Sequence, residues 1–217
     1  EEPLLASQEL EVVVDYLLAP GADTVEMTVV YSNTGSETNH FNPTLGIMAS
    51  DEVLWPWAAD VGLEGPEVFG DDVMSIGSTG KYGEATLSLW KNEGGMDLLG
   101  ATAIVSSVGF VAVSHGWVDL APGGSLSLAY NFTVAADTLQ AEATRRTVQG
   151  ETLASVSGQV VDAAGGSGIE GVRVHFANST VEPPLIAGFT YTDAEGNFTA
   201  QVPPGDWDVY AVARGVP

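Results

Sequence analysis

Acidic residues gather in the segment DEVLWPWAADVGLEGPEVFGDD, residues 51–72, which contains no basic residue. Carboxylates grouped in a loop, together with loop carbonyls, supply the oxygen ligands that Ca²⁺ prefers. If the chain binds a metal, we therefore expect calcium at Asp51, Glu52, Asp60, Asp71 and Asp72. The segment lacks the D-x-D-x-D-G pattern of a compact calcium loop, so a solvated acidic loop is the alternative.

The same segment contains the sequence WPW, with Trp55 and Trp57 on either side of Pro56. Exposed indoles at such a site would stack on sugar rings and make Trp55 and Trp57 a glycan-binding surface. The alternative is that they bury their large apolar area at one end of a sheet. Because proline donates no hydrogen bond, we do not expect both indoles to lie inside a regular strand. We expect the other tryptophans, Trp90, Trp117 and Trp207, to lie in the core.

Residues for catalysis are dispersed along the sequence. His40, His115 and His175 are far apart, and none belongs to an H-x-H, H-x-x-x-H or D-x-H motif of a hydrolytic metal centre. The sequence has no cysteine and no G-x-S-x-G motif, which excludes thiol chemistry and disulfides and gives no sign of a serine nucleophile. We predict no catalytic residue, no enzyme activity, and no cofactor other than calcium.

The net charge of −23 arises from 29 acidic and only 6 basic residues. Nucleic acids and anionic membranes are polyanions, so we exclude both as partners. The apolar runs are far shorter than the roughly 20 residues that span a bilayer, so we expect no membrane insertion. Such acidity suits salty or extracellular surroundings, and the termini suggest a piece of a longer protein. The expected partners are other domains of that protein, copies of this chain, or a glycan.

Strand patterns dominate the first part of the chain. LEVVVDYLL (10–18) and TVEMTVVYSN (24–33) are rich in β-branched residues and are joined by the turn sequence APGAD. In the second run, alternate residues form one apolar face of a half-buried strand: Val25, Met27, Val29 and Tyr31. A Pro-Gly-Gly turn then precedes the strand SLSLAYNFTVA (125–135).

One helix is predicted, over about 137–149. Asp137 stands at its N-cap with Gln140 three residues later, which is the spacing of a capping box, and Gly150 ends it. Arg145 and Arg146 in the last turns suit the helix dipole. After the helix, five strand patterns follow, separated by Gly- and Pro-rich turns. In the last of them Trp207, Val209, Ala211 and Ala213 alternate, and we expect them to face inward. The TDAEGN turn at 192–197 predicts a hairpin.

The C-terminal text resembles the carboxypeptidase regulatory-like domain, a β-sandwich of the transthyretin or collagen-adhesin-B type. The resemblance rests on VSGQVVDAAGGSGIEGVRVHF (156–176) and TYTDAEGNFTAQVPPGDWDVYAVA (190–213), in the family's order. It implies a non-catalytic stalk, spacer or docking module. Residues 1–150 resemble, more weakly, bacterial extracellular β-sandwiches.

We therefore expect an all-β chain of two antiparallel β-sandwich domains in tandem, at 1–150 and 153–217, with one short connecting helix. The expected function is a non-catalytic, extracellular structural or docking module of a larger secreted or surface protein. Three alternatives stay open. They are a self-assembling fibre or surface-layer subunit that uses calcium, a glycan-binding module, and the accessory N-terminal fragment of a secreted metal-dependent hydrolase.

Overall fold

The chain forms several antiparallel sheets and one helix. A computed structural model describes residues 9–50, 54–59, 75–80, 85–92, 97–99, 108–180 and 185–212. The predicted class, mostly β with one helix, is confirmed in this part of the chain. The helix is α1 (Thr138–Val148), and it is not long and apolar enough to cross a membrane. The strands are β1 (Leu10–Leu18), β2 (Thr24–Asn33), β3 (Asn39–Phe41), β4 (Thr44–Ser50), β5 (Leu54–Ala58), β6 (Ser75–Gly80), β7 (Thr86–Trp90), β8 (Asp97–Leu99), β9 (Val108–Ser114), β10 (Val118–Leu120), β11 (Ser125–Ala135), β12 (Ala154–Gln159), β13 (Arg173–Asn178), β14 (Leu185–Tyr191), β15 (Asn197–Val202) and β16 (Asp208–Val212).

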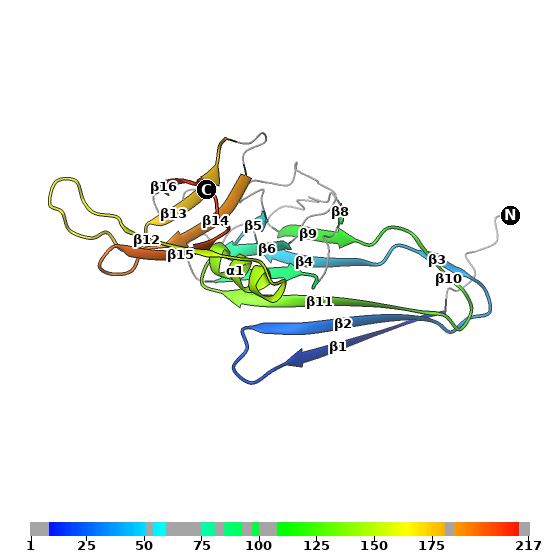
Figure 1. Cartoon of the computed structure of the whole chain (residues 1–217). Helices are drawn as coiled ribbons and strands as arrows, with labels where there is room; N and C mark the ends of the chain where they lie inside the picture. The colour runs from blue at the N-terminus through cyan, green and yellow to red at the C-terminus, as the bar shows by residue number, and fades with distance from the viewer. Residues whose placement is uncertain are drawn as a thin grey trace.

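The largest sheet has six strands in the order β1-β2-β11-β7-β6-β5 (Figure 1). β1 and β2 have the bounds predicted from the sequence, and the turn between them is closed by the Ala22 N–H, which donates to the Ala19 carbonyl at 3.0 Å. All nine residues of β1 pair with β2 in one continuous register. The local alternation of apolar residues was therefore sufficient to place this hairpin.

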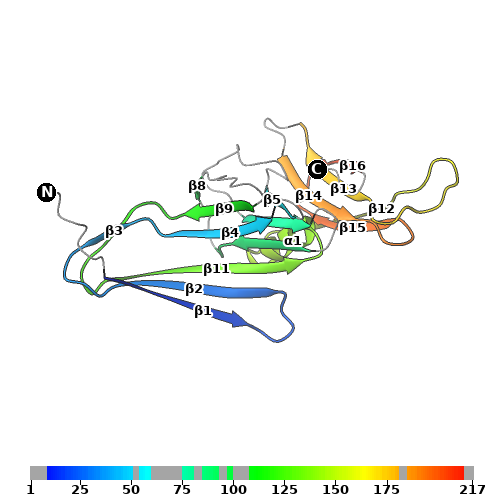
Figure 2. The same cartoon turned by 180° about the vertical axis from the view of Figure 1, so that it is seen from behind.

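The core of this part lies between the six-stranded sheet and the three-stranded sheet β4-β9-β8. The predicted apolar face of β2 contributes Met27 and Val29, and Leu45 of β4 packs against them from the second sheet. Figure 2 shows β4 and β9 alongside the long strands β2 and β11. The buried members from neighbouring strands are Ile76, Leu89 and Tyr130.

The WPW sequence lies in β5, so the expectation that Pro56 prevents a regular strand there is wrong. β5 is an edge strand, and Pro56 pairs in register with Ser78 of β6. The Ala59 N–H donates to the Ser75 carbonyl at 2.9 Å, so the backbone groups of residues 55, 57 and 59 point toward β6. Pro56 therefore occupies the outward position, where a missing N–H costs the ladder nothing.

All five strands predicted after the helix are present, in two sheets with the orders β14-β13-β16 and β12-β15. Both sheets contribute to one core, to which α1 adds Leu139. The ring of Phe198 lies over Gly158, its partner in the β12–β15 ladder, so a Cβ at position 158 would lie 2.5 Å from the ring. The other buried members of this core are Val174, Phe176, Ala187, Ala200 and Val202.

The predicted hairpin at 192–197 is wrong in its pairing. β14 pairs with β13 and β15 pairs with β12, so the turn passes from one sheet to the other. Its local chemistry is as expected: Asp193 accepts from the backbone N–H of Asn197 at 2.8 Å, and Gly196 has a φ of 80°. The turn residues therefore fixed the bend but not the partner strand.

The final strand is also more exposed than predicted. Val209 and Ala211 are exposed and Trp207 is only partly buried, while Ala213 lies outside the described residues. β16 forms an edge of its sheet, which leaves both of its faces less covered than those of the central strand β13.

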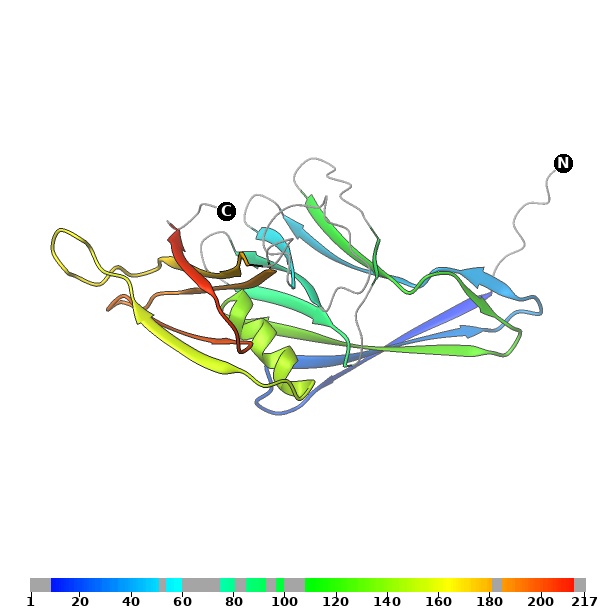
Figure 3. The same ribbon diagram turned by 45° about the horizontal axis from the view of Figure 1, so that its top comes forward.

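The predicted helix is confirmed, with Asp137 as its N-cap. The Asp137 carboxylate accepts from the Gln140 N–H at 2.8 Å, and the Gln140 side chain accepts in turn from the Ala136 N–H at 2.9 Å. In Figure 3, α1 lies between the six-stranded sheet and the C-terminal strands. It contacts β7 and β11 on one side and β14 and β15 on the other.

Candidate functional site

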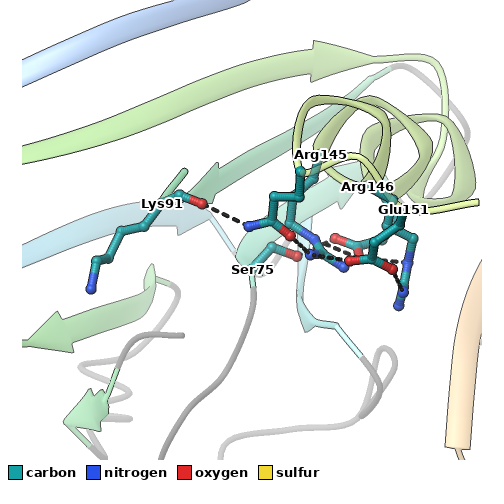
Figure 4. Close-up of polar contacts among 7 residues, drawn as sticks. Ser75, Lys91, Arg145, Arg146 and Glu151 are labelled. Atoms are coloured by element: carbon teal, nitrogen blue, oxygen red, sulfur yellow. Dashed lines mark hydrogen bonds and ion pairs between the residues drawn. The ribbon is translucent and has the colours of Figure 1, made fainter. Parts of the chain in front are cut away.

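A group of buried polar side chains lies where α1 meets the six-stranded sheet (Figure 4). Glu142 and Arg145, one turn apart on the helix, are 3% and 0% exposed. The Arg145 Nε and Nη2 atoms both donate to the Oε2 atom of Glu142, at 3.0 and 2.8 Å. The other carboxylate oxygen accepts from the hydroxyl of Ser75, at the start of β6. This buried ion pair thereby joins the helix to the sheet.

The network continues to the end of the helix. The Arg145 Nη1 atom donates to Gln149 and to Glu151, the latter at 3.3 Å. The Gln149 amide donates to the Lys91 carbonyl at 2.9 Å, just after β7. Arg146 pairs with Glu151 at 2.6 Å. Every nitrogen of the Arg145 side chain therefore has a partner within this network.

The first turn of α1 makes a second set of contacts, to β14. The Thr190 hydroxyl donates to the Asp137 Oδ2 atom at 2.7 Å. The Thr138 hydroxyl donates to the Phe189 carbonyl at 3.2 Å and accepts from the Phe189 N–H at 2.8 Å. Burial raises the pKa of Asp137, against the hydrogen bonds from Thr190 and Gln140, which lower it. The helix start thus occupies backbone groups at the outer edge of β14.

A groove follows the exposed side of α1. It consists of two adjoining cavities of about 500 Å³ and about 210 Å³, whose linings share Gln140, Ala143 and Gln201. The acidic members of its lining, Glu151 and Asp137, are already bonded to Arg146 and Thr190. The other described lining residues offer amide, hydroxyl and apolar groups, and among them no nucleophile lies beside a base: Leu139, Gln140, Ala143, Thr144, Thr147, Val148, Leu153, Thr199, Ala200 and Gln201.

The three imidazoles occupy different settings. His40 in β3 is exposed and pairs with Asp119 at 2.6 Å. The His115 Nε2 atom lies 2.5 Å from the Tyr130 hydroxyl, and burial raises the pKa of this tyrosine. Among the described residues, no group of three His, Cys, Asp or Glu is placed to hold a metal ion.

His175 is the buried imidazole. It stacks on Tyr210 with ring centroids 5.0 Å apart, and its Nε2 atom has no hydrogen-bond partner among the described residues. Burial and the neighbouring Arg173 lower the pKa of His175 to about 4. The Arg173 guanidinium lies 5.3 Å from the centre of the Phe189 ring. The arrangement holds a neutral imidazole in an aromatic cluster on the face of β13 opposite the core.

Of the predicted site residues, Trp57 is 4% exposed and packs with Ala135 and Ala141 at the base of α1. Its indole has no open face, which corresponds to the packing alternative for this residue. Trp55 lies in β5, and its side chain lies outside the described residues. The predicted calcium ligands also lie outside the described residues: Asp51, Glu52, Asp60, Asp71 and Asp72.

The exposed aromatic is instead Trp117, which we expected in the core. It is 69% exposed and stacks on His40, with ring centroids 4.8 Å apart and planes 5° from parallel. His40 lies in β3, and Trp117 comes just before β10, which pairs with β3 in a two-stranded sheet. Trp90, by contrast, is buried as predicted and donates to the Thr133 hydroxyl at 3.0 Å.

Sequence reasoning missed the buried ion pair. The sequence indicated only that Arg145 suits the helix dipole and did not predict that it is fully buried. The spacing of Glu142 to Arg145 and Arg146, at three and four residues, is the available sequence signal. The contribution of Ser75, which lies 67 residues away, has no local signal.

No protein-family model matches the sequence, and no curated protein matches it. Among solved structures, the chain is similar to a polysaccharide lyase (TM-score 0.49, 11% identity, 96% of this chain and 33% of the lyase). It is also similar to a galactose mutarotase related enzyme from Lactobacillus acidophilus, with a TM-score of 0.31 and 12% identity over 58% of this chain and 61% of the enzyme. A third similar structure is the Slr1438 protein from Synechocystis, with a TM-score of 0.39 and 12% identity over 58% of this chain and 55% of that protein. The chain thus spans a third to about three fifths of these proteins, and at such TM-scores the similarity carries no functional assignment.

Proposed function

We propose that this chain is a non-catalytic structural and docking module, working outside the cell as part of a larger secreted or surface protein. In this proposal residues 1–150 and 153–217 form two β-sandwich domains, and the C-terminal one is of the carboxypeptidase regulatory-like type. The helix α1 serves as the strut that fixes one domain against the other.

The observation that supports this function is the two-sided attachment of α1. On one side, Glu142 accepts a hydrogen bond from Ser75 of β6 and forms a buried ion pair with Arg145. On the other side, Asp137 and Thr138 are bonded to β14. Buried polar groups need such partners, and here the partners belong to the scaffold itself. The buried polar side chains of α1 therefore hold the six-stranded sheet and the sheet of β14 together.

Calorimetry tests the strut. Rigid attachment predicts one cooperative unfolding transition for the whole 217-residue chain. In the double variant Asp137→Ala, Thr138→Ala, the C-terminal strands should unfold in a separate, earlier transition. Two transitions in the unmodified chain would contradict the strut.

Turnover assays test the non-catalytic assignment. The purified chain should not hydrolyse phosphoesters or peptides, should not cleave polysaccharides and should not interconvert aldose anomers, with or without Ca²⁺, Zn²⁺ or Mn²⁺. Turnover that co-purifies with the chain and is lost on substitution of His40, His115 or His175 would overturn the assignment.

A second candidate function is glycan binding, and the exposed Trp117 favours it. Its indole is 69% exposed, and only one of its faces is covered by His40. A flat, exposed indole beside an imidazole and the carboxylate of Asp119 offers stacking and hydrogen bonds to a sugar ring. A glycan array signal that is lost on Trp117→Ala and kept on Trp207→Phe would support this function. An array without signal would contradict glycan binding, and the structural function would be the remaining candidate.

A further inference from the structure

β1 is an exposed, apolar edge strand. It is the outer strand of the six-stranded sheet, and Figures 1 and 2 both show it at the free edge of the molecule. Six of its nine side chains are large, apolar and between 40% and 69% exposed: Val12, Val13, Val14, Tyr16, Leu17 and Leu18. Monomeric proteins rarely leave so continuous an apolar strand uncovered.

The hydrogen-bond pattern between β1 and β2 decides which backbone N–H and C=O groups of β1 face the open edge. The Thr34 N–H donates to the Glu9 carbonyl at 2.9 Å, in the register that continues through β1 and β2. Because hydrogen-bonded pairs alternate in an antiparallel ladder, the odd residues of β1 bond to β2. The even residues therefore present their N–H and C=O groups to the open edge: Leu10, Val12, Val14, Tyr16 and Leu18. All five are apolar, and they lie on the face that carries Met27 and Val29 in β2.

β1 also lacks the devices that protect other edges of this chain. The outer edge of β14 is covered by Thr138, which bonds to both backbone groups of Phe189. The opposite edge of the six-stranded sheet carries Pro56. β1 contains no proline, no lysine and no bulge, and its two charged residues are Glu11 and Asp15.

We propose that β1 pairs with β1 of a second copy of this chain, antiparallel, about a two-fold axis at Val14. In this register Val14 faces Val14 of the other copy, Val12 faces Tyr16, and Leu10 faces Leu18. Each of these is a pair of outward-pointing residues, so their backbone groups form the hydrogen bonds that the free edge lacks. The two sheets then continue as one, with a shared apolar face.

The charges of β1 are compatible with self-pairing and favour this register over its two nearest alternatives. With Val14 on the axis, Glu11 faces Leu17 and Asp15 faces Val13, so no carboxylate faces another. A shift of two residues in one direction sets Asp15 against Glu11, and in the other direction sets Asp15 against Asp15. Directly opposed like charges destabilise a strand pair. A shift of one residue places free backbone groups against occupied ones, so the self-pairing about Val14 is favoured.

This inference rests on the proposed structural function and names its partner. It also predicts an unusual salt dependence. Each copy carries a net charge of −23, and Glu11 and Asp15 of opposite copies become diagonal neighbours about 7–8 Å apart. Repulsion reaches about 30 Å at 0.01 M salt but only about 3 Å at 1 M salt. Sedimentation equilibrium of the 217-residue chain should therefore show a monomer at low salt and a dimer at 1 M NaCl.

Cross-linking tests the register. The chain has no cysteine, so a single Val14→Cys variant carries one thiol per copy. On the axis, the two Cα atoms would lie about 5.5 Å apart, within the range for a disulfide. The matched control is Val12→Cys, whose Cα atoms would lie about 14 Å apart along the strands. Oxidation at 1 M NaCl should link Val14→Cys at least about tenfold faster than Val12→Cys. Equal rates would overturn the register.

A charge exchange tests the partner. Val14→Lys alone and Val14→Glu alone should each weaken the dimer at least about tenfold, and mixing the two should restore it. The control is Val134→Lys, which places the same charge at another exposed valine and should leave the dimer intact. A chain that stays monomeric at 100 µM in 1 M NaCl would overturn the proposal, and so would a dimer that neither Val14→Lys nor Val14→Glu weakens. Either result would leave the turnover assays of the proposed function unaffected, so the two failures are distinguishable.

Discussion

The Thr190 hydroxyl donates a 2.7 Å hydrogen bond to the same Asp137 carboxylate that caps α1. One side chain therefore begins the helix and attaches it to the C-terminal sheet. Asp137 and Thr190 are both buried. When either side chain is truncated, water therefore does not replace the lost hydrogen bond to the other.

Asp137→Ala should lower the free energy of unfolding by about 2–4 kcal/mol, because it removes a cap and leaves the Thr190 hydroxyl buried without its acceptor. Asp137→Asn should cost less than about 1 kcal/mol, since asparagine also caps helices. Thr190→Val keeps the helix cap, so its loss of unfolding free energy should lie between those of Asp137→Ala and Asp137→Asn. Urea unfolding measures all three, and an equal loss for Asn and Ala would contradict the capping role.

Gly188 allows the helix to approach β14. Its φ is 134°, and a Cβ there would lie 2.7 Å from the Thr138 hydroxyl oxygen. Gly188→Ala should therefore destabilise the chain by about 2–3 kcal/mol, through backbone strain and this clash. Gly116→Ala is the control, because Gly116 also has a positive φ but nothing lies within 4 Å of its Cβ position. Thermal unfolding should show a clearly smaller loss for the control.

The buried ion pair predicts a non-additive mutant cycle. Arg145→Met should destabilise the chain by about 3–5 kcal/mol, because it leaves the buried Glu142 carboxylate without its main partner. The double variant Glu142→Leu, Arg145→Met should recover much of this loss, since no buried charge then remains. Arg146→Met, which removes a more exposed partner, should cost about 1 kcal/mol or less. Additive losses in the double variant would show that the pair is not coupled.

His175 predicts a stability loss in acid. Its pKa is lowered from 6.5 to about 4 by burial and by Arg173, so the unfolded chain binds the proton more readily than the folded one. The contribution of the neutral His175 side chain to the free energy of unfolding is complete above pH 6.5 and is lost as the pH falls from about 6.5 to about 4. The loss amounts to about 3 kcal/mol over that window.

His175→Phe should remove this contribution and keep the stacking on Tyr210. Between pH 7 and pH 5 the unfolding free energy of the variant should vary less than that of the unmodified chain. Because carboxylates titrate in both proteins, the difference between the two profiles isolates the imidazole. Parallel profiles would contradict a neutral, buried His175.

Two tryptophans should differ sharply in their effect on stability. Trp90→Ala should cost about 3–5 kcal/mol, because Trp90 is fully buried and bonded to Thr133. Trp117→Ala should cost less than about 0.5–1 kcal/mol, because Trp117 is exposed. Acrylamide quenching provides a second measurement: the most accessible fluorescence among the described tryptophans should disappear in Trp117→Ala.

The elements that local chemistry determines were predictable from the sequence. β1, β2 and α1 were found at or near their predicted bounds, because alternation, turn residues and the Asp137 cap act over a few residues. The five C-terminal strands were found for the same reason. Their pairing was not, since the Asp193 turn bends the chain equally well within one sheet or between two.

The site features that depend on distant segments were the ones missed. The network around Arg145 is completed by Ser75, which bonds to Glu142, and by the Lys91 carbonyl, which accepts from Gln149, and both come from distant segments. Trp117 was expected inside because it lies in strand-like sequence, but it precedes the short strand β10 and is 69% exposed beside His40. In both cases contacts between distant segments, rather than the local pattern, decide exposure.

Pro56 limits how far pairing through β1 can extend. Two copies joined at β1 would each turn their β5 strand outward, and the proline nitrogen at the outward position cannot donate to a third copy. Addition of further copies to the merged sheet would stop there. Assembly through this sheet is thereby directed to a closed pair, and polymerisation would require a different surface.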